Sequence, residues 1–212
     1  MDELELLKKD WKKQDADYPK LSYTEIYKLI HKKSTSIVKW ILVICIAEFI
    51  FWGLLNLLIP ESYFEIYEKF HLKLFLDITQ ILHYVVIIVF IYFFYKNYNS
   101  ISVVESTSLL MKKIINTRKI VNYYVYYNLI LYALLSIIVN IILFSNSDLL
   151  IESLNPKDSS IDKDYFLRFL IIAQIITFFV FCGLLWLYYR IIYGILLRKL
   201  TKNYKELESL EF

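Results

Sequence analysis

Few side chains in this sequence could carry out chemistry, and two of them stand in strongly apolar surroundings. Glu48 lies in the stretch ICIAEFIFWGLLN (residues 44–56), and His83 lies in a similar stretch further along the chain. A carboxyl group beside an imidazole can share or pass a proton. Ionisable groups in such surroundings are also used to join helices. The pair therefore predicts either a polar contact between two helices or a site that handles protons or a small solute.

Catalytic and metal-binding motifs are otherwise absent from the sequence. It contains no glycine-rich phosphate loop, no His-Glu-x-x-His and no Gly-x-Ser-x-Gly. Its three histidines, His31, His71 and His83, fall at different predicted depths and are not expected to share a metal ion. Cys45 and Cys182 have no second cysteine or histidine at ligand spacing, so both are predicted to be free thiols. We expect no enzymatic activity, no cofactor and no metal.

Long apolar segments position Glu48 and His83. Hydrophobic residues make up 58% of the 212 residues, and only 3 Gly and 3 Pro are present, which disfavours a many-stranded β-protein. A helix needs about 20 residues to cross the hydrocarbon core of a bilayer. Four stretches reach that length: 37–59, 74–95, 122–144 and 166–189. The sequence predicts an all-α, polytopic membrane protein with a bundle of four transmembrane helices and short cytoplasmic helices.

The charges between these stretches predict the orientation. Lysine and arginine predominate just before the first span, in residues 96–121 and in residues 190–212, whereas the other two loops are acidic. Basic segments near span ends remain in the cytoplasm. The prediction is a cytoplasmic N-terminal helical segment (1–36), a membrane domain (37–189) with an amphipathic cytoplasmic loop (96–121), and a cytoplasmic tail (190–212). A net charge of +3 is too small to indicate direct nucleic-acid binding.

The N-terminal segment shows two helix starts. Leu4, Leu7 and Trp11 fall on one face of the first predicted helix, and Ser22 with Glu25 has the spacing of a capping box that starts a second. Such amphipathic helices pack on each other or lie against membrane lipid. The more specific alternative is a docking surface for a cytosolic protein, with Leu4, Leu7 and Trp11 as its apolar anchors.

Glu48 and His83 are predicted to pair. Both lie near the middle of their predicted spans, and the two spans are consecutive and antiparallel, so the side chains fall at a similar depth. A polar group in the bilayer centre needs a partner in the bundle interior. We expect a protonated Glu48 to donate to His83. The contact joins helices in one interpretation and handles protons or a small solute in the other.

The opening MDELELLKKDWKKQ and the segment LSYTEIYKLIHKKS, followed by a Trp- and Phe-rich first span, resemble small four-span inner-membrane proteins of flavobacteria and their relatives. The similarity is one of pattern over the whole chain. It implies a multi-pass protein of the bacterial inner membrane with cytoplasmic termini. Some members of that group look like partners of extracytoplasmic-function sigma factors, as membrane anti-sigma proteins are.

Two functions follow as hypotheses. The leading one is a non-enzymatic inner-membrane protein that holds a cytosolic protein partner through its N-terminal helices, in the manner of an anti-sigma regulator. The alternative is a small transporter or channel-like protein that handles protons or a small solute at Glu48 and His83. Membrane lipid is expected around either form, and a homo-oligomer is compatible with both.

Overall fold

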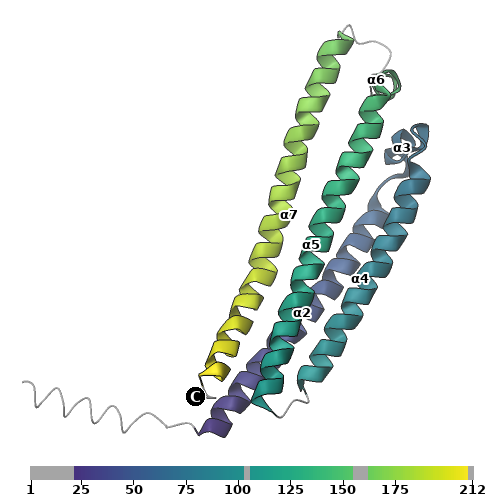
Figure 1. Cartoon of the computed structure of the whole chain (residues 1–212). Coiled ribbons are helices and arrows are strands. Elements are labelled where there is room, and N and C mark those ends of the chain that lie inside the picture. The colour runs from purple at the N-terminus through teal and green to yellow at the C-terminus, as the bar shows by residue number, and fades with distance from the viewer. Residues whose placement is uncertain (1–21, 103–105, 155–161, 210–212) are drawn as a thin grey trace, which may run out of the picture.

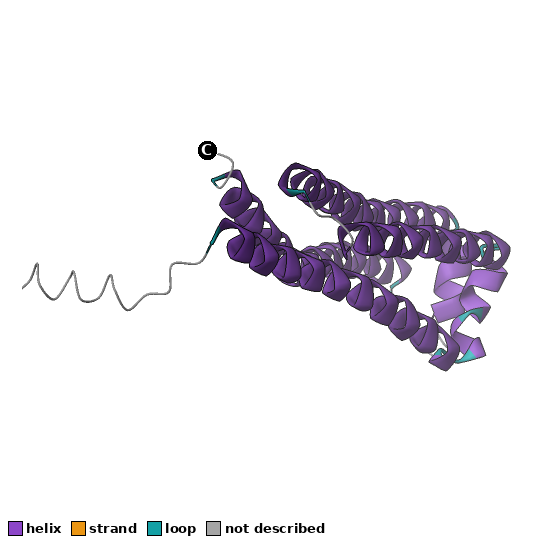
Figure 2. Ribbon diagram, turned by 90° about the horizontal axis from the view of Figure 1, so that it is seen from below, coloured by secondary structure: helices purple, strands orange, loops and turns teal. Residues whose placement is uncertain are grey.

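A computed structural model of the chain describes residues 22–102, 106–154 and 162–209, and all regular secondary structure in these ranges is helical (Figure 2). The predicted docking residues Leu4, Leu7 and Trp11 lie outside the described residues. The four long helices are α2 (Tyr23–Leu58), α4 (Lys73–Ser102), α5 (Thr107–Ser145) and α7 (Lys163–Glu208). The described ranges also contain three short helices: η1 (Glu61–Tyr63), α3 (Glu65–Lys69) and α6 (Ser147–Leu154).

The four long helices lie side by side as a bundle (Figure 1). Helix α2 packs on α4 and α7, and α5 packs on the same two helices from the other side. Each of the four is long and apolar enough to cross a membrane. The predicted all-α bundle with four membrane-spanning helices is confirmed.

The helices extend well beyond the apolar stretches. Helix α7 has 46 residues, which corresponds to about 70 Å of helix, against about 30 Å for the hydrocarbon core of a bilayer. The extra turns lie at the end of the bundle where α2 starts and α7 finishes, here called the basic end. Helix α2 runs unbroken from Tyr23 through the first apolar stretch, and the chain after residue 189 continues α7. The described parts of the predicted terminal segments and middle loop are therefore largely continuations of the long helices.

The start of α2 has the expected capping box. The Ser22 amide donates to Glu25 Oε2 at 2.8 Å, and the Glu25 amide donates to Ser22 Oγ at 3.3 Å. These contacts with the Ser22 backbone and side chain hold the pKa of the Glu25 carboxyl below its usual value. The local sequence signal thus fixes where the first long helix begins.

The opposite end of the bundle, here called the acidic end, carries small helices that were not predicted. There η1, α3 and α6 form a cap over the long helices, with Phe70, Leu72 and Leu150 buried together. His71 adopts a positive φ of 55° in the turn that leads from α3 into α4. An exposed ion pair joins Lys73 to Glu68, and such pairs add little stability.

Burial is uneven along the bundle. From the level of Glu48 to the basic end, the four helices enclose a continuous core that includes the fully buried Phe94, Ile114 and Leu207. Toward the acidic end, apolar side chains of α5 and α7 point outward, as Phe179 shows with 68% of its surface exposed. A continuous exposed apolar surface on long helices suits a lipid environment.

Candidate functional site

Glu48 lies in the bundle core and is bound by two tyrosines from other helices. Its side chain is only 6% exposed. The Tyr124 hydroxyl on α5 donates to Glu48 Oε2 at 2.5 Å, and the Tyr188 hydroxyl on α7 donates to Oε1 at 2.6 Å. Glu48 of α2 is therefore hydrogen-bonded to both α5 and α7.

Further tyrosines surround this contact. Tyr193 is 1% exposed, and its ring lies 5.7 Å from that of Tyr124 and 5.9 Å from that of Tyr189, measured between centroids. The Tyr193 hydroxyl is buried and close to Glu48, but it makes no hydrogen bond with the described atoms. We call Glu48, Tyr124, Tyr188, Tyr189 and Tyr193 the Glu48 cluster. In this cluster Tyr124 and Tyr188 donate to the carboxyl group, and the buried Tyr193 hydroxyl has no hydrogen-bond partner among the described atoms.

His83 has a different partner. Its Nδ1 lies 3.3 Å from the Tyr127 hydroxyl, and the two rings stack with centroids 5.7 Å apart. Among the described residues, no hydrogen bond or ion pair joins His83 to Glu48. The predicted pair is not formed in the structure: Glu48 binds hydroxyls from α5 and α7, and His83 binds Tyr127.

The level of Glu48 relative to the third and fourth apolar stretches was not predicted. Tyr124 lies near the beginning of the apolar stretch 122–144, and Tyr188 lies near the end of the stretch 166–189. Since both bind Glu48 directly, Glu48 is level with the ends of those two stretches on the side of the basic end. It does not lie at their middle. The cluster thus joins the middle of the first apolar stretch to the ends of the third and fourth.

Additional polar contacts continue from the cluster toward the basic end. Asn203 of α7 donates to Ser34 of α2 at 2.9 Å, and both side chains are buried. His31 Nε2 lies 2.8 Å from the Ile101 carbonyl oxygen of α4. The described ranges hold no group of three or more His, Cys, Asp or Glu side chains that could bind a metal ion. The arrangement suits precise helix packing and, at Glu48, proton exchange.

The tyrosines were missed in the sequence because their pattern is ambiguous. Tyrosine is frequent here, with 19 residues, and it commonly lies at membrane boundaries with no further role. The useful signal was the position of Tyr188, Tyr189 and Tyr193 on one helix, together with Tyr124 at a corresponding depth on another. Only the packing of the helices shows that they converge on Glu48.

Four apolar helices in a bundle, with polar contacts on its inside, indicate a multi-pass membrane protein. The chain belongs to the family described as Domain of unknown function (DUF8845), which matches residues 24–212. That match includes all the described helices except the first residue of α2. No curated protein and no solved structure matches the chain.

Proposed function

We propose that this chain is a non-enzymatic protein of the bacterial inner membrane that holds a cytosolic protein partner at its basic end. Both termini lie in the cytoplasm in this proposal, as the charge pattern predicts. The observation that carries it is the packed extension of all four long helices beyond the apolar stretches.

The extension is built as a fixed structure. Ile101, Leu110 and Leu207 are fully buried there, from three different helices. The hydrogen bond from Asn203 to Ser34 joins α7 to α2 in the same region. A packed core of this kind holds side chains in defined positions. A segment attached at Ser22 therefore leaves the bundle from a defined point, which supports its use as a platform for a partner.

The surface of the platform supports an acidic or anionic contact. Exposed basic side chains are numerous at this end, among them Lys28, Lys32, Lys112, Lys119 and Lys202. Opposite charge on a partner accelerates and orients its approach. The face of Leu4, Leu7 and Trp11 would add the apolar anchors that dominate binding energy in interfaces. In the form that the family resemblance implies, the partner is a sigma factor.

The partner hypothesis predicts a specific loss on substitution. Full-length protein purified in mild detergent should retain a cytosolic protein in stoichiometric amount. The double variant Leu7→Asp and Trp11→Asp should lose it by at least about tenfold, because charges replace the apolar anchors. Lys9→Ala with Lys13→Ala, on the opposite face of the predicted helix, is the matched control and should retain it. Absence of a stoichiometric partner, or its retention by the Asp double variant, would refute the proposal.

A second function is favoured by the unpartnered hydroxyl in the Glu48 cluster. A buried Tyr193 hydroxyl beside a carboxyl group can be satisfied by a water molecule or a small polar solute. Proton or solute transfer at Glu48 would follow.

In proteoliposomes with an entrapped pH dye, wild-type protein should then conduct protons above the level of empty vesicles. Glu48→Gln should abolish this flux, whereas His83→Gln should leave it, since His83 lies outside the cluster. Equal flux for wild type and Glu48→Gln would eliminate this function.

A further inference from the structure

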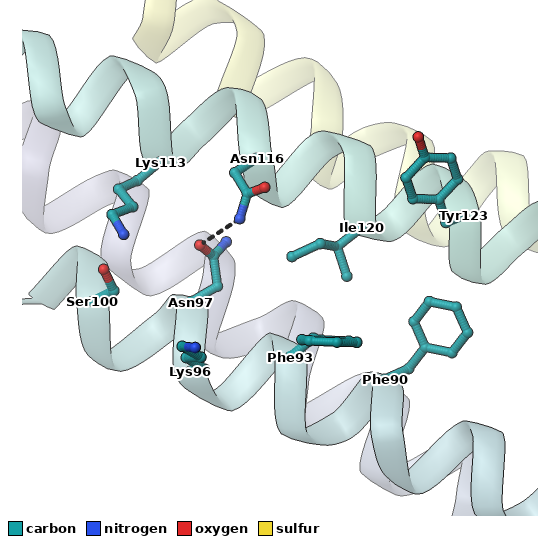
Figure 3. Close-up of a pocket in the computed structure, with 9 residues that line it drawn as sticks. All are labelled: Phe90, Phe93, Lys96, Asn97, Ser100, Lys113, Asn116, Ile120 and Tyr123. Atoms are coloured by element: carbon teal, nitrogen blue, oxygen red, sulfur yellow. Dashed lines mark hydrogen bonds between the residues drawn. The ribbon is translucent and has the colours of Figure 1, made fainter.

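A groove between α4 and α5 has not yet been assigned a role. It has a volume of about 600 Å³, and its lining residues extend from Phe90 and Tyr123 to Ser100 and Lys113 (Figure 3). Its lining comes from the two helices alone, and its character changes along its length. The basic-end part is lined by Lys96, Ser100, Lys113 and Asn116, and the part nearer the spans by Phe90, Phe93, Ile120 and Tyr123.

The order of these residues matches the direction of a membrane lipid. Helix α4 runs toward the basic end and α5 runs away from it, so Ser100 faces Lys113 while Phe90 faces Tyr123 (Figure 3). Phe90 and Ser100 are ten positions apart, which corresponds to about 15 Å of helix. Across that length the lining changes from aromatic to basic. The apolar part lies at the ends of the predicted spans, and the basic part lies beyond them.

The positive charge in the groove is not neutralised by the helices that form it. Helix α5 contains no Asp or Glu, and the one acidic residue of α4, Asp77, lies near its other end. Within the described ranges, neither Lys96 nor Lys113 takes part in an ion pair. Lys113 is half-buried, which limits its screening by solvent.

Polar side chains between the two lysines are held in place. Asn116 Nδ2 donates to Asn97 Oδ1 at 3.3 Å, and Asn97 in turn donates to the Thr117 hydroxyl. Asn97 and Thr117 are buried. This chain of hydrogen bonds fixes the spacing of α4 and α5 at the groove, so the site is formed before any ligand enters.

We propose that this groove binds one anionic glycerophospholipid of the cytoplasmic leaflet. Its phosphate contacts the ammonium groups of Lys96 and Lys113, and the start of an acyl chain lies on Phe93, Ile120 and Phe90. Basic pockets between helices on the cytoplasmic side are suited to anionic headgroups. The aromatic lining supplies the apolar contact that a free phosphate ion would not use. This site does not depend on the protein partner proposed above.

Native mass spectrometry of the full-length protein tests the proposal. Delipidated protein in a non-phospholipid detergent would be titrated with phosphatidylglycerol or with phosphatidylcholine of the same chain length. Wild type should bind one phosphatidylglycerol about tenfold or more tightly than phosphatidylcholine, since each lysine near an anionic headgroup contributes about 1 kcal/mol. Lys96→Gln with Lys113→Gln should remove this preference. Lys112→Gln with Lys119→Gln, which removes the same charge from exposed positions outside the groove, should retain it.

Two further arms separate the lipid from other occupants. Excess inorganic phosphate should not displace the lipid, whereas Phe90→Ala with Phe93→Ala should weaken lipid binding severalfold. Equal affinity for both lipids, an unchanged preference in the groove-lysine variant, or displacement by phosphate would overturn the proposal. So would a lipid-free dimer that Phe90→Ala with Phe93→Ala dissociates, because the groove would then be an interface between two copies of the chain.

Discussion

Replacing Glu48 with leucine should lower the melting temperature of the purified protein in detergent by roughly 5–10 °C. The substitution removes the acceptor to which the hydroxyls of Tyr124 and Tyr188 donate, and Tyr124 is buried. An unsatisfied buried polar group costs about 1–3 kcal/mol. For a chain of this size, each kcal/mol corresponds to about 2–4 °C. Glu48→Gln should cost less, because the amide oxygen still accepts one hydrogen bond.

Double-mutant cycles identify the partners of Glu48. The effects of Glu48→Leu and Tyr124→Phe should be less than additive by about 1 kcal/mol, because each substitution removes the same hydrogen bond. Glu48→Leu and His83→Leu should be additive, because His83 binds Tyr127 instead. Thermal unfolding of the single and double variants measures both cycles. Coupling of Glu48 to His83 but not to Tyr124 would contradict the observed arrangement.

Replacing Phe94 with alanine should destabilise the protein by about 3 kcal/mol. Phe94 is 0% exposed and packs edge-on against Tyr124, with centroids 5.9 Å apart. Removing such a ring leaves a cavity that a close-packed core fills only in part. Replacing an exposed phenylalanine with alanine leaves no such cavity.

Phe179→Ala is the matched control for Phe94→Ala. Phe179 is 68% exposed on α7, so its replacement should change the stability by less than about 0.5 kcal/mol. Denaturation in mixed micelles compares the two variants directly. Equal losses would mean that the acidic-end half of the bundle is packed as tightly as the basic-end half.

The long helices and the start of α2 were predictable because their signals are local. Apolar runs of about 20 residues indicate spans without knowledge of their neighbours. Ser22 and Glu25 are three residues apart, so their capping box is visible in the sequence and appears in the structure. The length of the helices was not predicted, because they continue beyond the apolar stretches into turns that bury one face against each other.

The contacts of Glu48 were not predictable because they depend on how the helices are offset along the bundle. The middle of its apolar stretch suggested the same depth as His83. The rings of Phe49 and Tyr84, the next residues along the two helices, do lie 5.6 Å apart between centroids. Glu48 nevertheless binds Tyr124 and Tyr188, which are 76 and 140 residues away in the sequence. Such offsets arise from the packing of whole helices. The basic groove was hidden for the same reason, since Lys96 and Lys113 converge only when α4 and α5 pack together.

Thiol labelling in intact cells tests most directly whether the packed basic end faces the cytoplasm, as the proposed function requires. Ser62→Cys, in η1, and Ser108→Cys, at the start of α5, are both exposed and lie at opposite ends of the bundle. The chain with only Cys45 and Cys182 serves as the background. A membrane-impermeant maleimide should label Ser62→Cys in intact spheroplasts and Ser108→Cys only after permeabilisation. Labelling of Ser108→Cys but not Ser62→Cys in intact spheroplasts would invert the orientation and contradict the account.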